Sequence, residues 1–93
     1  MVQARSDGIP KIYFIQVGEM GPIKIGFAHK KTVWTRMTEL QTGNPEKLNM
    51  LFFMPGTMEQ EKQLHQQFKH LRIRGEWFRP APELLLLVRD LKK

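Results

Sequence analysis

The chain has 93 residues, a length at which one compact core forms, so a second domain is not expected. Hydrophobic residues make up 41% of the chain, which is not the composition of a disordered tail. Cysteine is absent, which excludes a disulfide framework and a cysteine-ligated zinc site. The 15 lysines and arginines outnumber the 9 aspartates and glutamates and give a formal net charge of +6, which favours polyanionic partners, although such charge can also serve solubility alone.

Residues 1–10 predict a flexible N-terminal segment ahead of a single domain that spans residues 11–93. The segment has no apolar run of signal-peptide length. The longest apolar run in the chain, residues 84–88, is far too short to cross a bilayer. We therefore expect a cytoplasmic location and no membrane partner.

Residues 11–17 are rich in isoleucine, tyrosine, phenylalanine and valine and predict a strand. Residues 23–27 predict its hairpin partner, because the glycines and proline of residues 18–22 favour a turn between the two. Residues 48–54 supply a third strand, which Pro55 and Gly56 end. The pattern predicts a small three-stranded antiparallel sheet.

Helical spacing of apolar residues predicts about three helices. Thr32 caps the first, and Gly43 follows its last turn. The second begins after Thr57, which has capping-box spacing to Gln60, and its apolar stripe runs to Leu71. The expected fold is therefore α/β, of the α+β kind, with three helices flanking the sheet.

The third helix opens with Pro82 and carries four consecutive leucines, which cannot all face one core. One interpretation is that part of this leucine surface contacts another copy of the chain, giving a homo-oligomer. The alternative is a wide face buried under the sheet.

Glu61 falls inside the arc of the second helix that Met58, Leu64 and Phe68 define, so its carboxylate points along the core side. Burying a charged carboxylate is costly unless it is paired or binds a metal, which makes cation binding a reasonable role. Alternatively, Glu61 bends out to solvent or pairs with His65, one turn later. A lone histidine there is more typical of a core or supporting residue than of a ligand.

Several short motifs occur in order along the chain. They are Lys11-Ile-Tyr-Phe-Ile-Gln16, Ile23-Lys-Ile-Gly26, Arg36, Leu40-Gln-Thr-Gly-Asn-Pro45, Glu61-Lys-Gln-Leu-His65 and Gly75-Glu-Trp-Phe78. Together they resemble the GIY-YIG nuclease superfamily, in its compact phage-type branch, over residues 12–79. The resemblance implies a GIY-YIG-like fold and a metal-dependent endonuclease that hydrolyses phosphodiester bonds of nucleic acid, with DNA favoured.

The resemblance also implies roles for individual residues. Glu61 would hold one Mg²⁺ or Mn²⁺, Tyr13 would act on the attacking water, and Arg36 would stabilise the charge that develops on the phosphate. Lys24 departs from the superfamily pattern, which has a tyrosine in the second motif. It could support the Tyr13 phenolate as part of a general base, hold the scissile phosphate, or be an ordinary exposed lysine.

Residues 72–79 interleave arginines with aromatic residues, as expected of a surface that meets nucleic acid. The candidate contacts are Arg72, Arg74, Trp77 and Arg79. The alternative is a turn anchored by buried Trp77 and Phe78, with Glu76 paired to a neighbouring arginine.

Two other classes of function stay open. The first is a non-catalytic nucleic-acid-binding module, since the second motif lacks its tyrosine and no clear equivalent of the superfamily's late asparagine is present. The second is a protein-interaction domain that uses the leucine-rich C-terminal helix.

Overall fold

The computed structural model describes residues 7–93; residues 1–6 of the expected flexible segment lie outside the described residues. In chain order the elements are β1 (Lys11–Val17), β2 (Ile23–Ala28), α1 (Val33–Thr42), β3 (Leu48–Pro55), α2 (Met58–Gln67), the 3₁₀ turn η1 (Lys69–Leu71), β4 (Arg72–Arg74), β5 (Trp77–Phe78) and α3 (Pro82–Leu91). Throughout residues 7–93, each helix is too short or too polar to span a bilayer.

The sheet has five strands in the order β3-β1-β2-β5-β4, with every pair antiparallel. The α+β class is thus confirmed, but the expected three-stranded sheet is wrong. The three long strands form as predicted, and β4 and β5 add a short hairpin to the edge of β2. Strands of three and two residues are too short to show alternating hydrophobicity, so the sequence did not distinguish them from a surface turn.

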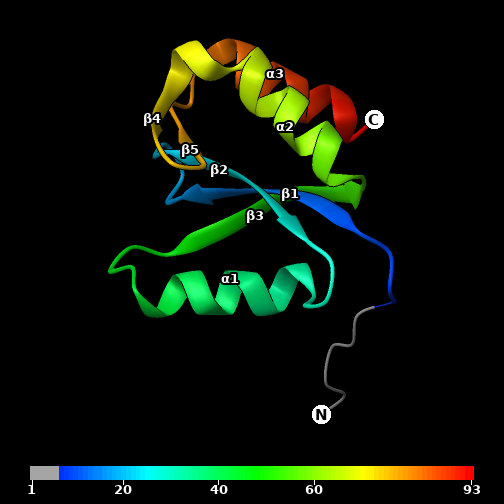
Figure 1. Cartoon of the computed structure of the whole chain (residues 1–93). Helices are drawn as coiled ribbons and strands as arrows, with labels where there is room; N and C mark the ends of the chain where they lie inside the picture. Colours follow the sequence, from blue (N-terminus) through cyan, green and yellow to red (C-terminus); the bar gives the residue numbers. More distant parts are fainter. Residues whose placement is uncertain (1–6) are drawn as a thin grey trace.

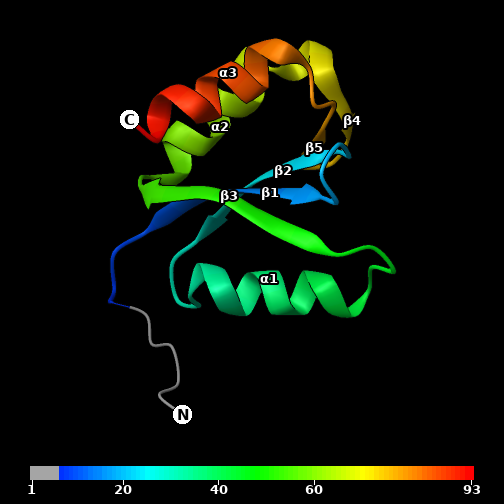
Figure 2. The same cartoon turned by 180° about the vertical axis from the view of Figure 1, so that it is seen from behind.

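Helices cover both faces of the sheet (Figure 1). Helix α1 lies on one face, and α2 and α3 lie together on the other, as the view from behind also shows (Figure 2). Strand β1 is central, between β3 and β2, and its five inner residues are all buried. A strand covered on both faces needs apolar residues on both, which explains the hydrophobic run from Ile12 to Ile15.

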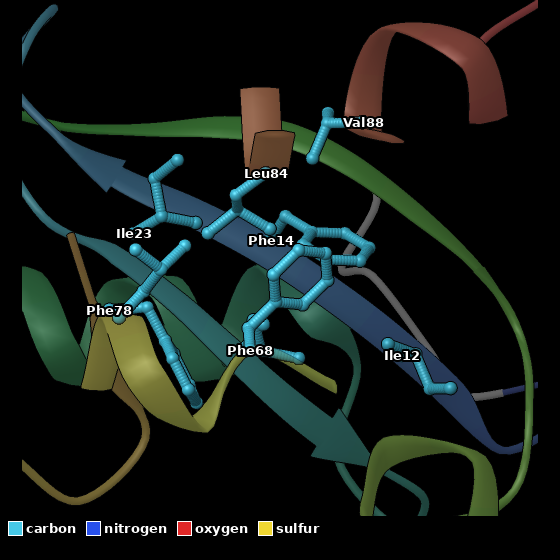
Figure 3. Close-up of a cluster of buried hydrophobic side chains, with 9 residues drawn as sticks. Ile12, Phe14, Ile23, Phe68, Phe78, Leu84 and Val88 are labelled. Carbon is cyan, nitrogen blue, oxygen red and sulfur yellow. The ribbon is translucent and has the colours of Figure 1, made fainter. Parts of the chain in front are cut away.

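The larger core lies between the sheet and the helices α2 and α3 (Figure 3). Ile12 and Phe14 of β1 contribute to it, together with Phe68 after α2 and Leu84 of α3. A smaller cluster under α1 contains Tyr13, with neighbours from β1, β2 and β3. Alternation along β1 therefore places Tyr13 on the α1 face, opposite the main core.

The helix starts agree with the sequence signals. The Thr32 hydroxyl accepts a hydrogen bond from Thr35 N, at 3.0 Å. Thr57 and Gln60 form the reciprocal capping box. Helix α2 is shorter than its apolar stripe suggested, because the chain turns into η1 at Lys69.

Helix α3 buries only part of its leucine run. Leu84 is fully buried, whereas Leu85 and Leu86 are 40% and 46% exposed. The run is thus divided between core and surface, and self-association through this helix stays a prediction.

The feature of the fold that matters most for the site is the edge of β2. Strand β5 pairs with only its first two residues, Ile23 and Lys24. Beyond them, Ile25 N donates to the backbone oxygen of Glu76 at 3.0 Å, and Ile25 O is bonded by His65 Nε2 of α2 at 2.8 Å. Helix α2 and the β4–β5 turn are thereby fixed beside the same point of the sheet edge.

Candidate active site

A cleft of about 510 Å³ opens where α1, α2 and the β4–β5 turn meet the sheet. Tyr13, Lys24, Arg36 and Glu61, the residues expected to share a site, all line it. The other lining residues are Phe27, Glu39, Leu40, Met58, Lys62 and Glu76. The structure therefore brings the predicted residues together from four different elements, while their chemical roles remain predictions.

Tyr13 lies over Gly26, its partner across the β1–β2 pair. A Cβ at position 26 would be 2.2 Å from Tyr13 Cζ and 2.4 Å from Tyr13 Oη, so only glycine leaves room for the ring. The side chain is buried, and burial, followed by the negative charge of Glu76, raises the pKa of Tyr13 to about 12. Arg36 acts in the opposite direction. The phenol is consequently neutral in the metal-free protein at pH 7.

Lys24 is not the freely exposed strand lysine that its position allowed. Its side chain is only 14% exposed, and Nζ forms an ion pair with Glu76 Oε1 at 2.8 Å. The ammonium also lies 5.5 Å from the centre of the Trp77 ring. Glu76 therefore pairs with this lysine, and the alternative interpretation, in which it pairs with a neighbouring arginine, is wrong on this point. Lys24 and Glu76 meet because β5 pairs with the edge of β2, and their spacing along the chain did not indicate this contact.

Glu61 is the buried carboxylate of the cleft, at 7% exposure. Among the residues 7–93, its Oε2 is a buried side-chain oxygen with no hydrogen-bond partner. Burial raises the pKa of Glu61, and the nearby Glu76 charge adds to the effect. A buried acceptor without a hydrogen-bond partner is costly, so this oxygen is a candidate ligand for a cation.

Glu61 has two potential co-ligands. One ligand atom from each of Glu61, His65 and Glu76 can be chosen so that all three lie within 4.8 Å of one another. His65 was expected to be a supporting residue, and Glu76 was not predicted at the site at all. The sequence signals for Glu76 were its place after the turn glycine Gly75 and inside the Gly75-Glu-Trp-Phe78 motif, and neither assigned it a role at the site.

Arg36 lies at the rim of the cleft. Its side chain is 46% exposed, and Nη1 is 3.6 Å from Glu39 Oε1. Lys31 Nζ also pairs with Glu39, at 2.5 Å. The guanidinium is therefore loosely held and can reorient toward a phosphate.

The cleft lining carries no excess positive charge. Three basic residues, Lys24, Arg36 and Lys62, face three acidic ones, Glu39, Glu61 and Glu76. The overall +6 charge consequently lies elsewhere on the protein. A bound divalent cation would make this cleft attractive to a phosphodiester.

The predicted nucleic-acid contacts lie beside the cleft, outside its lining. Arg74 pairs with Trp77, and Trp77 pairs with Lys24, so these three form a row on one face of the sheet. Arg72 instead pairs with Phe78, which is buried in the opposite core. Arg79 Nη2 donates to the backbone oxygen of His70 at 3.0 Å. Of the arginines, Arg74 is best placed to extend the cleft.

The fold and the cleft define a small α+β domain in which acidic, basic and phenolic groups gather near the β2 edge of the sheet. The T5orf172 domain model matches residues 11–92, and the chain belongs to that family. The predicted membership of the GIY-YIG superfamily is therefore wrong, since no GIY-YIG family model matches the chain. The resemblance to GIY-YIG nucleases rests on a few short sequence motifs, whereas the T5orf172 model matches almost the whole domain. Neither a curated protein nor a solved structure matches the chain.

Proposed function

We propose that the chain is a metal-dependent endonuclease that hydrolyses phosphodiester bonds of nucleic acid, with DNA favoured. One observation carries the proposal: Tyr13, Lys24, Arg36 and the buried Glu61, whose Oε2 has no hydrogen-bond partner among residues 7–93, converge on one cleft. Together these side chains suit three requirements of phosphodiester hydrolysis: Tyr13 with Lys24 suits proton removal, Arg36 suits phosphate binding and Glu61 suits cation binding.

The cation would be held by Glu61. Mg²⁺ or Mn²⁺ is the ion proposed, because oxygen ligands suit both. When bound, it would neutralise phosphate charge and stabilise the departing oxygen. It would also offset the Glu61 and Glu76 charges that disfavour ionisation of Tyr13.

Tyr13 would take the proton from the attacking water. With a pKa of about 12 in the metal-free protein, only about one molecule in 10⁵ is ionised at pH 7, so the positive groups around the phenol set its reactivity. Lys24 is the nearby ammonium on the same face of the sheet, and releasing it from Glu76 would favour the phenolate.

Arg36 would bind the non-bridging phosphate oxygens. A guanidinium offers paired donors that match two such oxygens. Its present partner, Glu39, is at 3.6 Å, so a phosphate has only a weak contact to displace. Arg74 and Trp77, next to Lys24, would contact the nucleic acid on either side of the cleaved bond.

The test is a cleavage assay with the purified protein on supercoiled, linear and branched DNA, with and without Mg²⁺ or Mn²⁺. Nicking that requires the metal, and that Tyr13→Phe and Arg36→Ala reduce by about 10² or more, is the expected result. Metal-independent nicking would indicate a contaminating enzyme. DNA binding without cleavage under every condition would instead support the non-catalytic binding module.

A further inference from the structure

We propose that Glu61, His65 and Glu76 together bind a single divalent first-row transition-metal ion, such as Mn²⁺, in preference to Mg²⁺. The inference rests on the proposed function in placing the ion beside the reacting groups, and it deepens that function by naming the ligand set. It assigns a metal-ligand role to His65 and Glu76, neither of which the proposed hydrolysis names as a ligand.

The three candidate ligand residues already lie close together. Three ligand atoms spread evenly at roughly 2.2 Å around one ion lie about 3.1 to 3.8 Å apart. Ligand atoms of Glu61, His65 and Glu76 lie within 4.8 Å of one another. A movement of roughly half an ångström to one ångström in the flexible carboxylate side chains would bring all three into coordination.

Glu61 has an oxygen that is available to an ion. Its Oε2 is buried and has no hydrogen-bond partner in the part of the chain that the structure describes. A solvated acidic cluster does not need a ligand, whereas a carboxylate at 7% exposure with an unused oxygen does. The cluster therefore contains a buried carboxylate, which distinguishes it from a chance grouping of surface acids.

His65 is held in one orientation by the backbone. Its Nε2 lies 2.8 Å from Ile25 O, and because a carbonyl oxygen only accepts, Nε2 must donate. In the neutral ring Nδ1 then carries the free lone pair. Metal-binding histidines are commonly fixed in this way, by a backbone carbonyl that bonds the other ring nitrogen. Edge contact with the Phe78 ring, 5.1 Å away between centroids, further restricts the imidazole.

Glu76 adds a coupling between the ion and the substrate-binding groups. In the metal-free protein its Oε1 is paired with Lys24 Nζ. Its move to the ion would leave Lys24 free to interact with Tyr13 or with a phosphate. Cation binding and activation of Lys24 would then be one event, controlled by a single carboxylate.

The ligand set determines the choice of ion. Mg²⁺ prefers oxygen ligands and retains most of its water, whereas an imidazole nitrogen strengthens binding of first-row transition ions. Two carboxylates and one imidazole therefore favour Mn²⁺ over Mg²⁺ at equal concentration.

The experiment measures Mn²⁺ binding to the full chain without nucleic acid, by electron paramagnetic resonance titration, with Mg²⁺ as competitor. The variants are Glu61→Gln, His65→Gln and Glu76→Gln, and thermal melting checks that each is folded. Two matched controls are Glu59→Gln, an exposed acid on the same helix, and His70→Gln, an exposed histidine. On the unaltered protein, pulsed resonance detects ¹⁴N coupling from a bound imidazole, which keeps the test valid if a variant fails to fold.

We expect one Mn²⁺ per chain, ¹⁴N coupling, and affinity losses of about 10-fold or more in each ligand variant but in neither control. Displacement should need at least roughly 10-fold excess Mg²⁺. Absence of ¹⁴N coupling, loss of affinity in Glu61→Gln alone, or displacement by equimolar Mg²⁺ would overturn the three-ligand site while leaving the proposed hydrolysis intact. Tight Mn²⁺ binding with no cleavage of any DNA would instead support the site and refute the proposed function.

Discussion

Tyr13 combines a central position in the cleft with a pKa raised to about 12, chiefly by burial. A general base acts in its deprotonated form, so more of the active species is present as the pH rises toward the pKa of the loaded site. We predict that kcat/KM for DNA cleavage rises about tenfold per pH unit from pH 6 until that pKa is reached. A pH–rate profile measured at saturating Mn²⁺ tests this prediction.

A rate that is flat or falling between pH 6 and 8 would remove Tyr13 as the base. Tyr13→Phe provides the control, because it should lose about 10²- to 10⁴-fold in rate and any residual rate should lack the Tyr13-dependent rise.

Glu61 should weaken the metal-free fold. Its pKa is raised above 4.5 in the folded protein, so folding favours the protonated form. The stability associated with this group is full below about pH 4.5 and is lost as the pH rises through the folded-state pKa. At pH 7 without metal, Glu61→Gln should therefore be more stable than the parent, by about 1 kcal/mol or roughly 4 to 8 °C in Tm.

Thermal melts at pH 7 and pH 4 in chelator measure this difference, which should shrink at the lower pH. Saturating Mn²⁺ should reverse it, since only the parent retains the full ligand set. A Glu61→Gln protein that melts below the parent at pH 7 in chelator would contradict the account.

At the scale of the elements, the β1–β2 pair holds Tyr13 through Gly26. A methyl group at position 26 would overlap the phenol ring, with 2.2 Å to Cζ, so Gly26→Ala must displace the ring or separate the strands. We predict a loss of about 1 to 3 kcal/mol in unfolding free energy and a cleavage rate at least roughly tenfold lower. Gly43→Ala is the matched control, because its Cβ would meet nothing within 4 Å.

Denaturant unfolding and the cleavage assay measure both effects. Equal behaviour of Gly26→Ala and Gly43→Ala would show that the close approach to Tyr13 does not constrain the site.

The elements that the sequence predicted are those whose signals are local. Capping at Thr57, Pro82 at a first helical turn and the apolar run of β1 each depend on neighbouring residues alone. The β4–β5 hairpin formed instead because the edge of β2 was available, which no local pattern encodes. Glu76 escaped prediction for the same reason, since it reaches Lys24 only through that edge.

The shared placement of Tyr13, Lys24, Arg36 and Glu61 was predictable because each lay on a recognisable strand or helix face. The ionisation states were not. Burial, the Lys24–Glu76 pair and the balance of charge in the cleft arise only when separate elements meet.

At the scale of the whole molecule, the +6 charge lies largely outside the charge-balanced cleft and should govern nucleic-acid binding. If about four or five phosphates are neutralised, log affinity should fall against log salt with a slope of roughly −4. Arg74→Ala should reduce the slope by about 1, because Arg74 lies in line with Trp77 and Lys24. Fluorescence anisotropy with the non-cleaving Tyr13→Phe protein and Mn²⁺ measures the slopes.

Arg89→Ala is the control for that measurement, since Arg89 is an exposed arginine of α3 with Asp90 as its neighbour. Its removal should leave the slope unchanged. A parent slope near zero would exclude nucleic acid as the partner.

The most direct test of the central claim compares the cleavage rates of Glu61→Gln and Glu59→Gln with saturating Mn²⁺, after melts have shown both to be folded. Both changes remove one carboxylate from the same helix, but only Glu61 lines the cleft. The account predicts a rate at least about 10²-fold below the parent for Glu61→Gln and an unchanged rate for Glu59→Gln. Cleavage by Glu61→Gln at the parent rate would contradict it.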